Sequence, residues 1–169
     1  MGQGRKLLYV GNDGELFNLL KDQHLRNCRW HSLDDPYQVV QKLGAAPTLD
    51  DLAAEPETWE QCYQDRYAGV ILDTDLSGEK AAEILRSIKS HDGGIPVIML
   101  TRQTSLASVC LARLDGAEAC FVKPLQSPNS LLHAIQEALQ KHRRWEQSLQ
   151  AALSFEPACL DNAPQASGL

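Results

Sequence analysis

Residues 70–78 have the sequence Val70-Ile71-Leu72-Asp73-Thr74-Asp75-Leu76-Ser77-Gly78, and this stretch decides the fold. Its three leading apolar residues are typical of a strand whose sheet is covered by helices on both faces. Asp73 then lies at the carboxyl end of that strand, the edge where open parallel sheets bind ligands. An isolated Asp at this place is equally well explained as a turn residue or a helix cap. The other strand ends of the chain decide between these interpretations.

Five segments have the composition of strands, and a helical pattern follows each one. The strands are predicted at residues 6–10, 28–32, 67–72, 95–100 and 119–122. Helices are predicted at residues 15–25, 36–43, 79–90 and 106–114, and from 128 onward. Parallel neighbours need crossover connections of this kind, and such connections are right-handed. The sequence therefore predicts an α/β fold with three layers, α/β/α, around a doubly wound, five-stranded parallel sheet.

Polar side chains follow four of the predicted strands. They are Asn12 and Asp13 after the first strand, Asp73 after the third, Thr101 after the fourth and Lys123 after the fifth. We expect them to share one edge of the sheet. A carboxylate that accepts a phosphoryl group needs a cation with oxygen ligands, usually Mg²⁺. A hydroxyl and an ammonium suit the phosphoryl oxygens, so the set predicts a site that forms an aspartyl phosphate.

Three motifs carry a resemblance to a known family. They are Leu-Asp-Thr-Asp-Leu-Ser-Gly around Asp73, Pro-Val-Ile-Met-Leu-Thr ending at Thr101, and Gly-Ala-Glu-Ala-Cys-Phe-Val-Lys-Pro around Lys123. Over residues 5–142 the chain resembles the response-regulator receiver domains of two-component phosphorelays. The resemblance implies a flavodoxin-like sheet with strand order 2-1-3-4-5. It also implies that Asp73 is the phosphoacceptor, Thr101 the switch hydroxyl and Lys123 the phosphoryl contact, with the main-chain carbonyl of Asp75 as a metal ligand.

The sequence departs from this family at the metal site. Two adjacent acids usually follow the first strand, whereas this chain has Gly11-Asn12 and places its nearest carboxylate, Asp13, one residue later. Asn offers a neutral oxygen in place of a charged one, and the loss of a negative ligand weakens a site for a hard cation. We therefore expect a weakened Mg²⁺ site formed by Asn12, Asp13, Asp73 and the carbonyl of Asp75. Asp13 is alternatively a helix N-cap or a solvated acid.

Two functions follow as hypotheses. In the first, Asp73 accepts a phosphoryl group from a histidine kinase or phosphotransfer protein and switches an attached output domain or a separate effector protein. Such a phosphoacceptor is not an enzyme beyond self-catalysed transfer and autodephosphorylation. The second is a pseudo-receiver, an interaction or dimerisation module independent of phosphorylation. It is favoured by Gly11-Asn12 and by Cys120, which stands at the family's aromatic switch position and is too short to swing.

The remaining composition excludes several other classes. The formal charge of −6 and the pI near 5.3 argue against direct nucleic-acid binding. No apolar run approaches the roughly 20 residues that span a bilayer, so we expect a cytoplasmic protein without a membrane segment. The five Cys and five His residues lack zinc-ligand spacing. The turn at residues 11–14 has no phosphate-binding spacing, which disfavours a nucleotide- or flavin-binding enzyme on this fold.

The predicted domain organisation has a core and an extension. The receiver domain is expected at residues 1–145, with an insertion at residues 45–66 between the second helix and the third strand. This insertion is either a small helical elaboration or a tolerated surface loop. Residues 146–169 have the composition of a helical extension and a linker or disordered tail. The extension either contacts another domain or subunit or lies on its own domain. The first alternative includes a homodimer. The linker composition suggests a fragment of a longer regulator.

Overall fold

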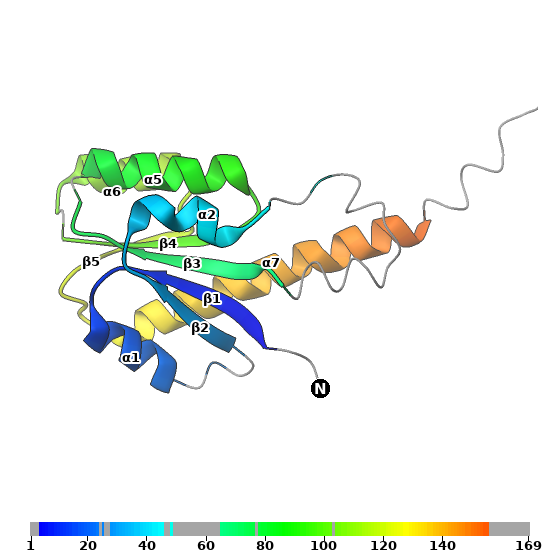
Figure 1. Ribbon diagram of the computed structural model, residues 1–169, viewed down its shortest axis with the longest axis horizontal. Coiled ribbons are helices and arrows are strands. Elements are labelled where there is room, and N and C mark those ends of the chain that lie inside the picture. The colour runs from blue at the N-terminus through cyan, green and yellow to red at the C-terminus, as the bar shows by residue number, and fades with distance from the viewer. Residues whose placement is uncertain are drawn as a thin grey trace, which may run out of the picture.

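A parallel five-stranded sheet forms the centre of the computed structural model, which describes residues 4–23, 25, 28–45, 48, 65–76, 78–102 and 104–155. The strand order is β2-β1-β3-β4-β5, and each pair of neighbours is parallel (Figure 1). The strands are β1 (Arg5–Val10), β2 (Cys28–Leu33), β3 (Tyr67–Asp73), β4 (Val97–Thr101) and β5 (Ala119–Val122). The predicted fold class and strand order are therefore confirmed.

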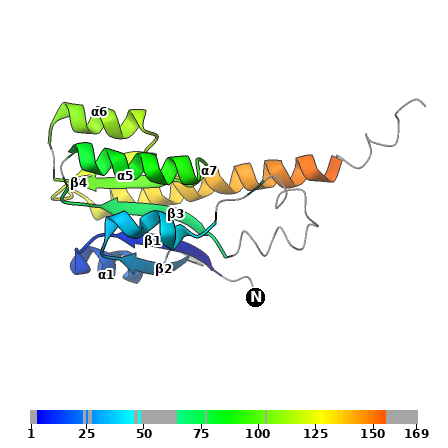
Figure 2. The same cartoon turned by 45° about the horizontal axis from the view of Figure 1, so that its top comes forward.

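Helices cover both faces of this sheet. They are α1 (Gly14–Asp22), the 3₁₀ turn η1 (Pro36–Gln38), α2 (Val39–Leu43), α5 (Gly78–His91), α6 (Leu106–Leu114) and α7 (Pro128–Phe155). Figures 1 and 2 show α1 and α7 on one face and α2, α5 and α6 on the other. The three predicted layers are confirmed.

The core consists of two apolar clusters, one on each side of the sheet. Successive side chains of a strand point to opposite faces, so β1 sends Leu8 and Val10 to one cluster and Leu7 and Tyr9 to the other. The first cluster also holds buried residues of α5, and the second holds buried residues of α1 and α7. Because both faces are covered, the ends of β1 and β3 are buried and their positions are tightly fixed.

Several element ends differ from the sequence prediction. α1 ends at Asp22 rather than at residue 25, and β4 begins at Val97 rather than at residue 95. The predicted helix at residues 36–43 is split into η1 and α2, with the Asp35 side chain capping η1. Gly44, which has a positive φ of 80°, ends α2 as expected. The differences lie at element ends, where capping rather than apolar periodicity decides which residues are included.

The helix α7 runs without a break through the predicted domain boundary at residue 145. The helix extends past the sheet in Figure 1. Trp145, at the predicted boundary, is 64% exposed. At the next residue the Glu146 carboxylate pairs with Arg5 at the start of β1, with Nη2 and Oε2 2.5 Å apart. The beginning of the extension thus contacts its own domain. Most of the predicted insertion, residues 46–47 and 49–64, and the tail at residues 156–169 lie outside the described residues.

Within the part of the chain that the structure describes, no helix combines the length and the apolar character needed to cross a bilayer.

Candidate functional site

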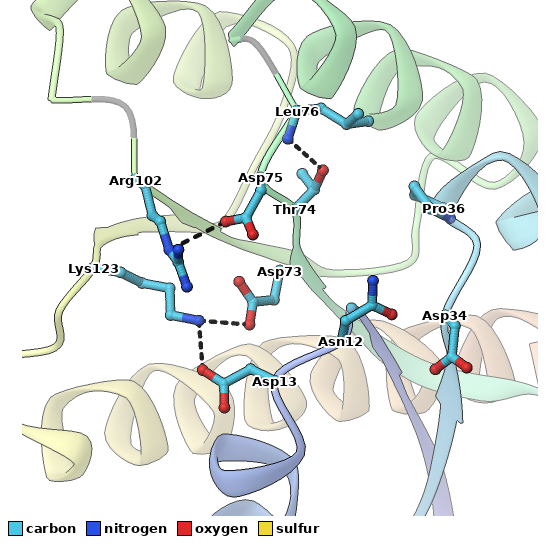
Figure 3. A pocket seen from close by; sticks show the side chains of 11 residues that line it. Asn12, Asp13, Asp34, Pro36, Asp73, Thr74, Asp75, Leu76, Arg102 and Lys123 are labelled. Carbon is cyan, nitrogen blue, oxygen red and sulfur yellow. Dashed lines mark hydrogen bonds and ion pairs between the residues drawn. The ribbon is translucent and has the colours of Figure 1, made fainter.

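A cavity of about 470 Å³ opens at the carboxyl edge of the sheet (Figure 3). Residues at or just after the end of every strand contribute to its lining. They are Asn12, Asp34, Asp73, Arg102 and Lys123, after or at the ends of β1, β2, β3, β4 and β5. Parallel strands that end at one edge account for this convergence of residues far apart in the sequence.

Asp73 is the last residue of β3, and its side chain is only 4% exposed. Its Oδ2 atom accepts hydrogen bonds from Lys123 Nζ at 2.9 Å and from the Tyr9 hydroxyl at 2.5 Å. Its other oxygen, Oδ1, makes no hydrogen bond to the described residues. A buried carboxylate needs such donors to offset its desolvation. The structure therefore brings Asp73 and Lys123 together, as the strand pattern predicts.

Lys123 directly follows β5 and connects two acids (Figure 3). Its Nζ lies 2.7 Å from Asp13 Oδ2 and 2.9 Å from Asp73 Oδ2, and the side chain is 10% exposed. Burial alone would lower the pKa of Lys123, but the hydrogen bonds to Asp13 and Asp73 outweigh it and raise the pKa above its ordinary value. Lys123 is therefore a fixed ammonium group at neutral pH. The peptide bond between Lys123 and Pro124 is cis.

Asp13 has two roles that occupy both of its carboxylate oxygens. It is the N-cap of α1, where Oδ1 accepts a hydrogen bond from Leu16 N at 3.0 Å. Its Oδ2 atom pairs with Lys123, and this hydrogen bond is the main cause of the lowered pKa of Asp13. The helix-cap alternative is therefore confirmed. The ion pair with Lys123 was not foreseen from the sequence.

Tyr9 is a site residue that the sequence analysis missed. It lies in β1 with its side chain buried, and its hydroxyl reaches Asp73 Oδ2. Burial, followed by the hydrogen bond to Asp73, raises the pKa of Tyr9 well above its ordinary value of 10.0. The sequence offered no signal for this role, because a tyrosine within an apolar strand has the pattern of a core residue.

Gly11 leaves no room for the side chain that the family usually has there. A Cβ atom at this position would lie 2.4 Å from the main-chain oxygen of Asp73 and 3.2 Å from the hydroxyl oxygen of Tyr9. The first distance is shorter than real Cβ contacts allow, so any other residue requires the backbone to shift. The Tyr9 hydroxyl thus lies beside the space that an acid at position 11 would enter.

Thr101 and Arg102 lie at the end of β4. Thr101 is buried, and its main-chain oxygen accepts a hydrogen bond from Lys123 N at 2.8 Å. Thr101 therefore shares the edge predicted for it, although its side chain does not line the cavity. Arg102, which was not predicted, lines the cavity and pairs through Nε with Asp75 Oδ1 at 3.2 Å. Both of these side chains are exposed, so this ion pair is accessible to water.

The side chains of the site, in this arrangement, do not fit a magnesium ion. Gly11 supplies no ligand, and both oxygens of Asp13 are already bound. Across the described ranges, no group of three or more His, Cys, Asp or Glu side chains is placed to hold a metal. Of the metal ligands predicted from the sequence, this leaves the oxygens of the Asn12 amide, Asp73 Oδ1 and the carbonyl of Asp75, and only Asp73 Oδ1 among them is charged. The weakened Mg²⁺ site predicted from the sequence stays a prediction.

Comparisons with known proteins identify the family and the fold of the chain. The family model for the response regulator receiver domain matches residues 36–136. The chain is similar to the DNA-binding response regulator MtrA of Mycobacterium leprae, with 30% identity over 73 residues that cover 43% of this chain and 32% of MtrA. It is also similar to the C4-dicarboxylate transport transcriptional regulatory protein DctD of Pseudomonas aeruginosa, with 29% identity over 122 residues that cover 72% of this chain and 24% of DctD. The chain thus spans no more than about a third of these relatives.

The fold has solved counterparts. One is the crystal structure of a CheY-like response regulator receiver domain protein from Methanospirillum hungatei JF-1, with a TM-score of 0.60 and 19% sequence identity. The similarity covers 83% of this chain and 98% of that one. At this identity the comparison supports the arrangement of helices and strands rather than the details of the site.

Proposed function

The chain belongs to the response regulator receiver domain family, and we propose that it accepts a phosphoryl group on Asp73 from a histidine kinase or phosphotransfer protein. The signal then passes to an attached output domain or a separate effector protein. The supporting observation is the environment of the Asp73 carboxylate. Donors hold Oδ2 in a buried position, while Oδ1 has no hydrogen-bond partner among the described residues, and Asp73 lines the cavity.

In this proposal Asp73 Oδ1 is the nucleophile. It forms a bond to phosphorus while the bond from phosphorus to the imidazole nitrogen of the donor's phosphohistidine breaks, and the released imidazole takes up a proton. Lys123 is an ammonium group next to Asp73, and in this proposal it offsets the charge of the phosphoryl oxygens. Arg102 adds a second cation to the cavity lining. Thr101, at the same edge, is the hydroxyl proposed to respond to the modification.

A direct test uses a small phosphodonor. The purified chain is incubated with acetyl phosphate and Mg²⁺, and its intact mass is followed with time. The proposal expects the mass to increase by one phosphoryl group, and the increase to be absent in Asp73→Asn. Asp75→Asn is the matched control, because Asp75 lines the same cavity on an exposed side chain and should still allow the modification. An unmodified wild-type chain, or a modified Asp73→Asn chain, would overturn the proposal.

A pseudo-receiver is the second candidate function, and a specific observation favours it. The positions that provide the family's acids hold Gly11 and Asn12, and Asp13 is bound to Leu16 N and Lys123. In this case the domain binds a partner or a second copy of itself irrespective of phosphorylation. Light scattering of wild type and Asp73→Asn, with and without acetyl phosphate, tests the self-association of this second candidate. The pseudo-receiver predicts the same assembly in all four samples.

A further inference from the structure

Tyr9 and Gly11 form a matched pair at the end of β1. The Tyr9 hydroxyl donates to Asp73 Oδ2, and the missing side chain at position 11 leaves space next to that hydroxyl. A Cβ atom at position 11 would come within 3.2 Å of the hydroxyl oxygen as well as 2.4 Å from the Asp73 main chain. An acid at position 11 and this placement of Tyr9 are therefore mutually exclusive without a backbone shift.

The position of the Tyr9 hydroxyl is fixed by packing. The ring belongs to the buried cluster shared by α1 and α7, and its centroid lies 5.4 Å from that of Phe17 in α1. Residue 9 pairs with Ile71 in β3, two residues before Asp73, so the side chain reaches along the strand to the carboxylate. This packing leaves the hydroxyl 2.5 Å from Asp73 Oδ2, to which it donates a hydrogen bond.

Two donors, one neutral and one cationic, thus meet on a single oxygen of Asp73. Lys123 supplies the charge and Tyr9 supplies a second, directed hydrogen bond. Together they satisfy a buried carboxylate at the place where the described residues do not fit a divalent cation. They also determine which oxygen stays available, because Oδ1 is left without a hydrogen bond to the described residues.

We propose that Tyr9 is a positioning residue for Asp73 and replaces the divalent cation in that role. The orientation of the carboxylate is then independent of metal. If phosphoryl transfer takes place at Oδ1, it also proceeds without metal, and this second part rests on the proposed function.

The first test is a double-mutant cycle between Tyr9→Phe and Asp73→Asn in EDTA, measured by urea unfolding. Tyr9→Phe keeps the packed ring and removes only the hydroxyl. A lost hydrogen bond to a charged group raises the unfolding equilibrium constant by roughly tenfold to a hundredfold. We expect that change with Asp73 present and a change about tenfold smaller in the Asp73→Asn background. Equal effects in the two backgrounds would overturn the inference.

Tyr67→Phe is the matched control for this cycle. Tyr67 is likewise a tyrosine of a central strand, partly buried, but its hydroxyl lies 2.7 Å from His31 Nδ1, at the opposite end of β3 from Asp73. We expect it to change stability by the same factor with and without Asp73→Asn, because the two sites are separate. If the effect of Tyr9→Phe depends on Asp73 and that of Tyr67→Phe does not, the stability change arises from the contact between the Tyr9 hydroxyl and Asp73. A general loss of packing would not depend on Asp73.

The second test does not depend on a Tyr9 variant. The thermal unfolding midpoint of the wild-type chain is measured in EDTA and at millimolar Mg²⁺, with Asp73→Asn as the reference. If Mg²⁺ bound at Asp73, it would raise the unfolding midpoint of the wild type alone. The inference expects no such binding, so Mg²⁺ should shift the midpoints of both proteins equally. A midpoint that rises with Mg²⁺ in wild type alone would show that the cation, not Tyr9, holds the carboxylate.

The third test separates this inference from the proposed function. Acetyl phosphate modification of wild type is compared in EDTA and in Mg²⁺. Similar rates in the two conditions support a metal-independent site. Modification only in Mg²⁺ overturns the inference and leaves the proposed function intact. Modification in neither condition overturns the proposed function, and the double-mutant cycle still decides the role of Tyr9.

Discussion

Lys123 and Asp13 form an ion pair beside the cavity, with Nζ and Oδ2 2.7 Å apart. The pair joins the residue after β5 to the cap of α1, and the same ammonium group also bonds Asp73. Asp13 therefore competes for the cation that a phosphoryl group on Asp73 would use. It also adds negative charge near an incoming anion.

Replacing Asp13 by Asn is expected to speed modification by acetyl phosphate severalfold. Asn keeps the helix cap, because it caps as well as Asp, but it removes the charge and releases Lys123. The initial rate is measured by intact mass. Asp34→Asn removes an acid that also lines the cavity but has no ion pair to Lys123, and it should have a smaller effect. Equal acceleration by the two variants would mean that net charge, not release of Lys123, controls the rate.

Replacing Lys123 by Met should destabilise the domain by about 3 kcal/mol, because it leaves the buried Asp73 charge with a single donor. The measurement is urea unfolding at neutral pH. Lys141→Met is the control, since Lys141 pairs with Glu118 on the surface and should cost less than about 1 kcal/mol. A similar loss of unfolding free energy in the two variants would show that the burial of the ion pair between Lys123 and Asp73 does not determine the cost.

Gly11→Ala should cost about 2 to 3 kcal/mol, because the added Cβ meets the main-chain oxygen of Asp73 at 2.4 Å. Gly14→Ala is the matched control. A Cβ atom added at position 14, in the first turn of α1, would meet no neighbouring group within 4 Å, so Ala should be neutral or stabilise by up to about 1 kcal/mol. Chemical unfolding of both variants checks the difference, and a tolerated Gly11→Ala would show that β1 and β3 separate easily.

Acid should weaken the contact between β1 and α7. Burial alone would raise the pKa of Glu146, but hydrogen bonds from His142 and Arg5 outweigh it and hold the pKa below its ordinary value of 4.5. A carboxyl group with a lowered folded-state pKa stabilises the fold fully above its unfolded-state pKa. That contribution is lost as the pH falls through the lower folded-state value.

The measurement for Glu146 is the thermal midpoint of wild type and Glu146→Gln between neutral pH and about pH 3. The wild type should be more stable at neutral pH, and the difference should shrink below pH 4.5. Glu137→Gln is the control, because Glu137 is exposed on the same helix and pairs only with His133 among the described residues. A difference that stays constant with pH would exclude the ionised Glu146 as its source.

Much of the fold was predictable because the sheet is covered on both faces. Burial on both sides produces continuous apolar runs such as residues 70–72, and these locate strands without an alignment. The split between η1 and α2 was not predictable in this way, because it depends on the Asp35 cap and local hydrogen bonds. Apolar periodicity carries little information about such local bonds.

The site was predictable to the extent that strand ends determine it. Asp73 and Lys123 meet because β3 and β5 are parallel strands that end at the same edge. Tyr9 was not predicted, since a tyrosine within an apolar strand is indistinguishable from a core residue until the pairing of β1 with β3 is known. The ion pair between Lys123 and Asp13 was also not predictable, because the two residues are far apart in the sequence and only the fold brings them together.

The uninterrupted course of α7 has a mechanical consequence. Its 28 residues make a rod about 42 Å long. Leu131 and Ile135 anchor the base of this rod under the sheet, and Arg5 clamps it again at Glu146. Any tilt of the helix about these contacts would therefore displace its distal turns the most.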